Sequence, residues 1–171
     1  MGLAGFDLEG NLTIGSVDMN QAAWAVIGDE RGQGGLINLW AGFDVRGEDR
    51  LLPSATGVIA YPRRMTATRH DLRLLVVGDV DVAGAPVANP VAGLQANLEY
   101  LRANVVAPVV SSTGTRAATL LMPSGATRTA NIHVLGLVTQ SYALSVVIDG
   151  CSQGALWIGT LQISIPGGRF S

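Results

Sequence analysis

One short motif in the sequence has the residue types and spacing for nucleophilic catalysis. Residues 150–154 read GCSQG, which matches the G-x-S-x-G pattern that exposes a serine on a tight turn between a strand and a helix. That turn requires a helix after the serine and a histidine later in the chain. A strand pattern follows Ser152 instead, and both histidines, His70 and His133, precede it. We therefore interpret the motif as part of a hairpin turn and predict no catalytic residue and no enzymatic activity.

Candidate metal ligands and cofactor sites are also few. Asp79 and Asp81 resemble the opening of a calcium loop, but Pro90 stands where an EF-hand carries its bidentate glutamate, so a turn is favoured. Neither histidine has a partner at metal-pair spacing, and the single cysteine, Cys151, cannot form an internal disulfide or a Cys-rich zinc site. The glycine-rich residues 32–35 lack the lysine of a phosphate loop. We predict no metal ion and no cofactor.

The elements that would position these residues are mostly strands. Apolar and polar residues alternate in 127–137 and 156–165, which is typical of half-buried strands. Residues 71–80 are apolar on both faces, as in a central strand. Hairpin turns are predicted at 123–125 and 149–150. Further strands are predicted at 12–15, 24–27, 57–61, 116–122 and 142–148.

One segment between residues 89 and 105 has a helical period. Asn89 is a good N-cap and Pro90 fits the first helical position. An apolar stripe with spacings of four, three and four consists of Leu94, Leu98, Leu101 and Val105. One helix among about eight hairpin-connected strands predicts a mainly β fold over a single domain, 1–171. The architecture is a sandwich or split barrel with the helix packed on one face or edge.

The composition favours assembly with other chains over nucleic-acid binding. Charged residues make up 14% of the 171 residues, below the roughly 25% of typical soluble chains, so much of the surface carries no charge. Charge-poor, partly apolar surfaces often mark sites where other chains pack. The formal net charge of −2 argues against a basic nucleic-acid-binding patch. The sequence shows no signal peptide and no apolar run of about 18 residues, so we expect synthesis and maturation in a cytoplasm.

The most informative region lies between residues 28 and 73. Glycines interrupt residues 28–56, which predicts a long loop or arm. The embedded apolar piece 36–40 favours an arm that docks on another surface. The alternative is that this piece forms a short strand within its own domain. Charges of both signs follow, and they suit either pairing between subunits or a solvated face. The predicted interface residues are Trp40, Asp44, Arg46, Glu48, Asp49, Arg50, Arg63, Arg64 and Arg69.

Five segments resemble minor tail proteins of actinobacterial siphophages, and the resemblance as a whole covers most of the chain, from about 12 to 168. They are 44–53 (DVRGEDRLLP), 57–64 (GVIAYPRR), 74–81 (LLVVGDVD), 93–102 (GLQANLEYLR) and 163–168 (ISIPGG). Their order is also similar to the N-terminal ring domain of distal tail proteins, which has a tail-tube fold. In that family a split β-barrel with one packed helix forms a hexameric ring between the tail tube and the baseplate.

The resemblance implies a structural virion protein of the tail, assembled in the host cytoplasm as a homohexamer. Its partners would be its own copies and other tail proteins, namely tail tube, tape measure and baseplate. Genomic DNA would pass through the lumen without sequence-specific binding, and no membrane would be involved. Because the chain has no length for the additional carbohydrate-binding-like domain of larger distal tail proteins, a tail-tube or neck ring remains an alternative. So do a glycan-binding β-sandwich that uses Trp24, Trp40 or Trp157, and a hydrolase that uses Ser152.

Overall fold

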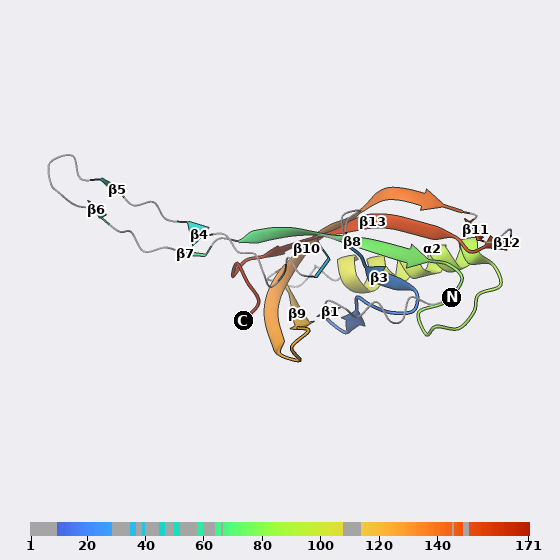
Figure 1. Ribbon diagram of the computed structural model, residues 1–171, viewed down its shortest axis with the longest axis horizontal. Coiled ribbons are helices and arrows are strands. Elements are labelled where there is room, and N and C mark those ends of the chain that lie inside the picture. Colours follow the sequence, from blue (N-terminus) through green and yellow to red (C-terminus); the bar gives the residue numbers. More distant parts are fainter. Residues whose placement is uncertain are drawn as a thin grey trace.

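The fold is described from a computed structural model (Figure 1). It describes residues 10–28, 67–107, 114–144, 146–148 and 151–171, together with short pieces at 35–36, 39, 45–46, 50–51, 58–59 and 64–65. Side chains are not described at 45–46, 50–51, 58–59, 64–65, 146–148 and 151–153.

Seven strands form one antiparallel sheet in the order β2-β1-β9-β10-β13-β8-β3. Their bounds are β1 Asn11–Ile14, β2 Val17–Asp18, β3 Trp24–Val26, β8 Thr68–Val77, β9 Arg116–Leu121, β10 Thr127–Ala143 and β13 Leu156–Ile165. β10 joins the two halves of the sheet, because it pairs with β9 through residues 127–132 and with β13 through residues 133–143. Register shifts between Val134 and Gly136 and between Thr139 and Ser141 interrupt the second ladder. Such irregularities increase local twist, and the sheet curls into a half-barrel.

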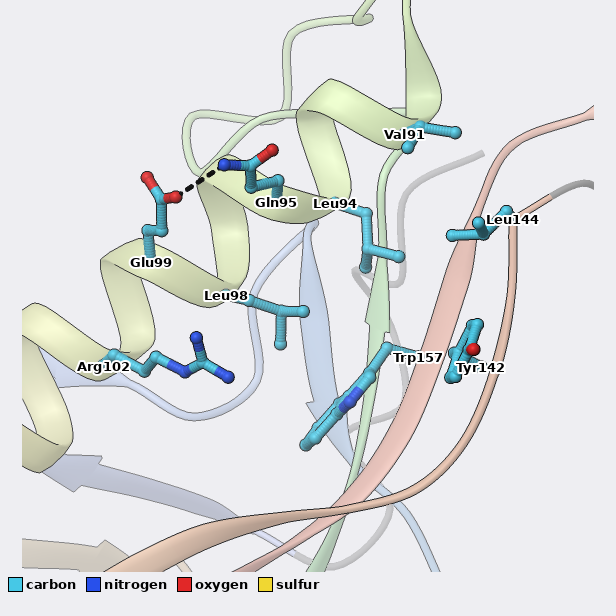
Figure 2. Close-up of a pocket in the computed structure, with 9 residues that line it drawn as sticks. All are labelled: Val91, Leu94, Gln95, Leu98, Glu99, Arg102, Tyr142, Leu144 and Trp157. Atoms are coloured by element: carbon cyan, nitrogen blue, oxygen red, sulfur yellow. Dashed lines mark hydrogen bonds between the residues drawn. The ribbon is translucent and has the colours of Figure 1, made fainter.

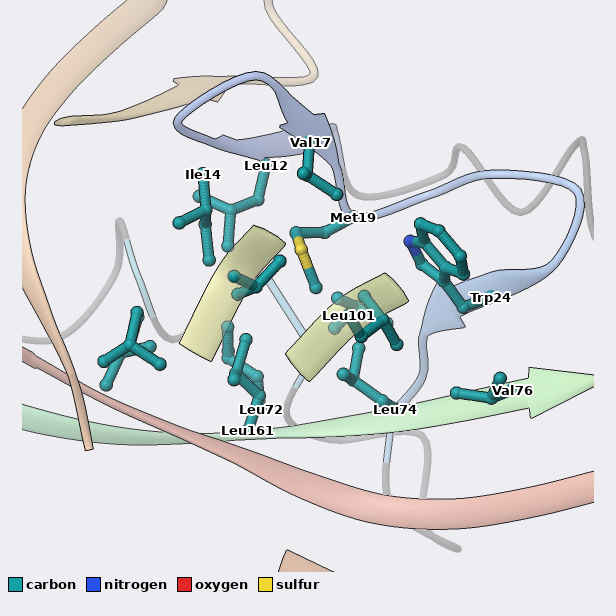
Figure 3. Packing of buried hydrophobic residues seen from close by; sticks show 14 of the residues in the cluster. Leu12, Ile14, Val17, Met19, Trp24, Leu72, Leu74, Val76, Leu101 and Leu161 are labelled. Atoms are coloured by element: carbon teal, nitrogen blue, oxygen red, sulfur yellow. The ribbon is translucent and has the colours of Figure 1, made fainter. Parts of the chain in front are cut away.

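The curled sheet wraps around one helical segment. α2 (Pro90–Leu101) continues without a break into a π-helical turn, η2 (Arg102–Val106). The Asn89 side chain caps α2 by accepting hydrogen bonds from the amides of Val91 and Ala92, so the predicted N-cap and the Pro90 start are both confirmed. Figure 3 shows this segment between β1–β2 on one side and β8–β13 on the other.

The core fills the space between the helix and the concave face of the sheet. Leu12 and Ile14 of β1 approach the helix from one side, and Leu72 and Leu74 of β8 from the other (Figure 3). Leu101 lies between them and is 1% exposed. Full burial of one such side chain contributes about 1.5–3 kcal/mol, so these contacts hold the helix inside the half-barrel.

A buried amide and two glycines fix α2 against the end of β8. The Asn97 side chain donates hydrogen bonds to the carbonyls of Val77 and Val80, both at 2.8 Å. Backbone approaches backbone so closely nearby that a Cβ on Gly93 would lie 2.2 Å from the Gly78 carbonyl oxygen. Side chains larger than hydrogen therefore cannot fit at this crossing without moving the helix.

Three smaller antiparallel pairs lie outside the main sheet. β11 (Val146–Ile148) pairs with β12 (Cys151–Gln153), and both follow β10 and precede β13 along the chain. β4 (Val45–Arg46) pairs with β7 (Arg64–Met65), and β5 (Arg50–Leu51) pairs with β6 (Val58–Ile59). Figure 1 shows the last two pairs beyond the N-terminal end of β8, with β5 and β6 farthest from the sheet. The 28–56 arm was predicted in this region, and most of it lies outside the described residues.

The prediction of a mainly β fold with one packed helix is confirmed. Two boundaries differ in an informative way. β10 continues past the strand predicted at 127–137 to Ala143, with register shifts after Val134 and Thr139, and so takes in the first two residues of the strand predicted at 142–148. Residues 146–148 of that predicted strand form the separate strand β11. The strand predicted at 57–61 is reduced, in the described residues, to β6, which pairs with β5 and not with the main sheet.

Candidate assembly surfaces

Arg69 is the single predicted interface residue whose side chain the structure describes. Its guanidinium Nε lies 3.9 Å from an Asp71 carboxylate oxygen, and the two side chains are 60% and 59% exposed. An ion pair this exposed contributes at most about 1 kcal/mol, so it leaves Arg69 available to other partners. Arg46, Arg50 and Arg64 are described as backbone positions in β4, β5 and β7, and the register places Arg46 opposite Arg64. The predicted residues outside the described part of the chain are Trp40, Asp44, Glu48, Asp49 and Arg63.

The second half of β10 forms a long open edge of the sheet. The ladder between β9 and β10 stops where Arg116, the first residue of β9, pairs with Ile132. Residues 133–143 of β10 therefore pair with β13 on one side and, among the described residues, with no strand on the other. An open edge presents unpaired backbone amides and carbonyls to any approaching strand.

This edge lacks the usual protection against association. Soluble proteins place charges or prolines on exposed edges, yet residues 133–144 (HVLGLVTQSYAL) contain no Asp, Glu, Lys, Arg or Pro. Four large apolar side chains there are about half exposed or more, namely Leu135 at 51%, Val138 at 49%, Tyr142 at 65% and Leu144 at 52%. An edge with this composition is typical of association surfaces.

The opposite side of the sheet is different. The Trp24 carbonyl of β3 accepts a hydrogen bond from the Gln21 amide, and the Val26 amide donates to the Asn20 side chain, so local residues close the outer edge of β3. β8 extends past β3, because it begins at Thr68 while the ladder between them runs only from Leu74 to Val76 of β8. β8 and β10 both run antiparallel to β13 and are therefore parallel to each other. The sheet thus has two unlike borders.

A groove of about 320 Å³ lies between α2 and the end of β10 (Figure 2). Its walls are mainly apolar, because Leu94 and Leu98 project from the helix while Tyr142 and Leu144 face them across the space. Trp157 of β13 forms the floor, and its indole N–H donates to the Thr139 hydroxyl at 3.1 Å, which fixes the ring. The remaining lining residues are Val91, Gln95, Glu99 and Arg102.

The motifs considered for chemistry occupy ordinary structural positions. Ser152 lies on β12 opposite Val147, and a strand rather than a helix follows it. The Asp81 carboxylate accepts a hydrogen bond from the Ala85 amide at 2.8 Å, as expected of a turn. His133 contacts the Gly114 carbonyl at 2.9 Å. No group of three His, Cys, Asp or Glu residues that could hold a metal ion occurs in the described part of the chain.

Two further observations concern glycans and membranes. Trp24 is fully buried and Trp157 is 5% exposed, so neither offers an open stacking platform for a sugar. Trp40, the third candidate for such a platform, lies outside the described residues. None of the helices in the described ranges has both the length and the apolar character needed to cross a membrane.

Sequence reasoning did not find the groove or the open edge. A signal for the edge was present, since residues 133–144 are free of charge and contain four large exposed apolar residues. The groove could not be found in this way. The groove exists because the fold places the flank of α2 at a short distance from Tyr142. The helical pattern of α2 and the strand pattern of β10 do not contain that distance.

No family model and no curated protein matches the sequence. Among solved structures, the chain is similar to the crystal structure of the Dit protein (gp 19.1) of phage SPP1, described as a paradigm of the hub adsorption apparatus in phages that infect Gram-positive bacteria. The TM-score is 0.52 at 15% sequence identity, and the similarity covers 92% of this chain and 50% of the SPP1 chain. The chain therefore spans half the length of SPP1 Dit. At this identity the likeness concerns the fold.

Proposed function

We propose that this protein is a structural subunit of a phage tail that works by assembling into a ring and not by catalysis. One observation carries the proposal, namely the similarity to the SPP1 Dit fold over 92% of the chain. The charge-free open edge of β10 supports it independently, because such an edge is an association surface in a soluble protein. The segments that resemble minor tail proteins, from 44–53 to 163–168, point the same way.

The two unlike borders of the sheet favour a ring over a two-fold dimer. Contact between the β10 edge of one copy and a different surface of the next is heterologous, and heterologous contacts close into rings when the rotation permits. The matching border is the outer edge of β8 at residues 68–72, where Arg69 and Asp71 lie. We infer six copies from the resemblance to the distal-tail family.

Within the tail, we propose the position of distal adaptor between the tail tube and the baseplate, with the tape measure as a further neighbour. The described hub role of SPP1 Dit supports this position over the alternative of a tail-tube or neck ring. Immunogold labelling of virions discriminates between them. Label at the distal tip supports the adaptor, label along the tail supports a tube subunit, and label at the head–tail junction supports a neck ring.

The sheet face opposite α2 suits a channel through which DNA slides. The register places Arg69 beside Ser164, Asp71 beside Gln162 and Arg73 beside Thr160 on this face, so the Asp71 carboxylate lies between two arginines and interrupts the positive charge. A DNA-binding surface would instead present a continuous basic patch that neutralises phosphates. We therefore place this face toward the lumen, where DNA would pass without sequence-specific binding.

The charged residues between 44 and 73 complete the proposed interface. The double change Arg46→Glu and Arg50→Glu should shift assembly toward monomers, because reversed charges repel the carboxylates that arginines would pair with. Circular dichroism should report an unchanged fold, and native mass spectrometry should report the loss of oligomers. Normal rings in this variant would remove the charged segment from the interface.

A further inference from the structure

We propose that the groove between α2 and β10 receives the Tyr100 flank of α2 from the neighbouring copy, so that α2 contributes both halves of one head-to-tail contact. The inference rests on the proposed ring and specifies which surfaces meet within it. Three features of the described residues carry it. They are the two flanks of the helix, the partly exposed Tyr100 ring on one flank, and the order of the strands below.

The two flanks of α2 face opposite borders of the sheet. Leu98 projects into the groove on the side of β10 (Figure 2). Two residues later, Tyr100 points about 200° around the helix from Leu98. Leu101 lies between these directions and packs in the core. The helix therefore separates a groove flank from a Tyr100 flank.

The Tyr100 flank presents an aromatic side chain that its own copy covers only in part. The Tyr100 ring stacks on Trp24 of β3, with ring centroids 5.7 Å apart and an interplanar angle of 27°. Trp24 is fully buried, whereas Tyr100 is 36% exposed, so Tyr100 forms the outer layer of this pair. Because Asn20 and Gln21 already satisfy the outer edge of β3, a contact at this border must use side chains and not an added strand.

The strand order determines what the groove can meet. The groove lies at the β10 border and Tyr100 at the β3 border of the same four strands, β10-β13-β8-β3. When copies are placed side by side in the same orientation, the β10 border of one faces the β8–β3 border of the next. The Tyr142 end of β10 then lies beside β3, because β10 and β8 are parallel and β3 pairs with the C-terminal part of β8. That arrangement brings Tyr100 of one copy to the apolar groove of its neighbour.

The occupant is thus a second copy and not an unrelated peptide, because both complementary surfaces lie on this chain. Leu98, Tyr142 and Leu144 supply an apolar wall without a charged group between them, which suits an aromatic ring. Glu99 and Arg102 stand at the rim, and the Glu99 carboxylate accepts a hydrogen bond from Gln95 at 2.8 Å. An aromatic anchor in an apolar pocket with a polar rim is the usual form of an interface hot spot.

Site-specific cross-linking tests the contact directly. In a Cys151→Ser background, Leu144→Cys places a thiol at the groove and Ala96→Cys places one on the Tyr100 flank, one turn before Tyr100. A short bis-maleimide should give cross-linked pairs only when the two single variants are mixed. The double variant should give a ladder of multiples. Dimers from Leu144→Cys alone would indicate a two-fold contact and overturn the proposal.

The aromatic ring itself is tested with a matched pair of variants. Tyr100→Ser should raise the concentration needed for assembly about tenfold or more, as loss of a hot-spot residue does, while Tyr100→Phe should assemble like the wild type. Monomer melting curves check that both variants fold. If rings form but neither the cross-links nor the Tyr100→Ser effect appears, this contact is wrong and the ring stands. If the protein never assembles, the contact and the proposed ring both fail.

Discussion

Removal of the Asn97 side-chain amide should destabilise the fold more than any other single amide change in the helical segment. Asn97 is 1% exposed and uses its amide nitrogen to bind two carbonyls, those of Val77 and Val80. Asn97→Ala leaves both carbonyls without this donor at the point where β8 ends and the chain turns toward α2. Asn97→Asp keeps the side-chain volume but replaces the donor with an oxygen that faces the same two carbonyls.

The magnitude follows from the number of bonds lost. A neutral hydrogen bond contributes about 0.5–1.5 kcal/mol net, and a buried group left without a partner costs about 1–3 kcal/mol. Two bonds with partial rehydration of the carbonyls therefore predict a loss of about 2–4 kcal/mol in the free energy of unfolding. For a chain of this size, that corresponds to a decrease in melting temperature of roughly 4–16 °C. Asn97→Asp should lose at least as much as Asn97→Ala.

Asn104 provides the matched control. Its amide donates to the Tyr100 carbonyl at 2.9 Å in an exposed position on the same helical segment, so Asn104→Ala should change stability by no more than about 0.5 kcal/mol. Urea unfolding followed by circular dichroism, at concentrations where the protein is monomeric, measures all three variants. The reasoning is refuted if Asn97→Ala lies within about 0.5 kcal/mol of Asn104→Ala, or if Asn97→Asp is as stable as the wild type.

Three further changes test other parts of the structure. Gly93→Ala should destabilise the protein in a thermal melt, because the new Cβ would meet the Gly78 carbonyl, and this clash outweighs the roughly 1 kcal/mol gain in helix propensity. Gly136→Ala is the control: its Cβ would meet no atom, so its melting temperature should be unchanged. Arg116 donates to the last carbonyls of η2, so Arg116→Met should lower the free energy of unfolding by about 1.5–3 kcal/mol; an unchanged urea midpoint would contradict this. Val138→Lys adds a charge to the open β10 edge, so oligomers should be lost in sedimentation velocity while the melting temperature of the monomer is unchanged. Intact oligomers would exclude this edge from assembly.

Local signals in the sequence were sufficient to predict the central helix and several strands. Asn89 and Pro90 define the start of α2 because an N-cap and a first-turn proline act within a few residues. The alternation in 156–165 reproduces the bounds of β13, since one face of that strand packs on the core along its full length. The prediction of Leu98 as part of the core stripe was only partly right, because Leu98 lies at the edge of that stripe and lines the groove.

The features that bear on assembly depended on tertiary structure. The continuation of β10 from Leu137 to Ala143 requires two register shifts against β13, which the residue pattern of β10 alone does not specify. The Trp24–Tyr100 stack joins residues far apart in the chain. Between Asp44 and Arg64, the structure describes no side chain of the predicted interface residues, so this interface stays a prediction.

The oligomeric state of the purified protein tests the central claim most directly. Native mass spectrometry combined with negative-stain electron microscopy should reveal closed rings with one discrete copy number, six by the proposed architecture, and a central channel. A protein that remains monomeric at high concentration, together with virions that contain no ring of it, would contradict the account.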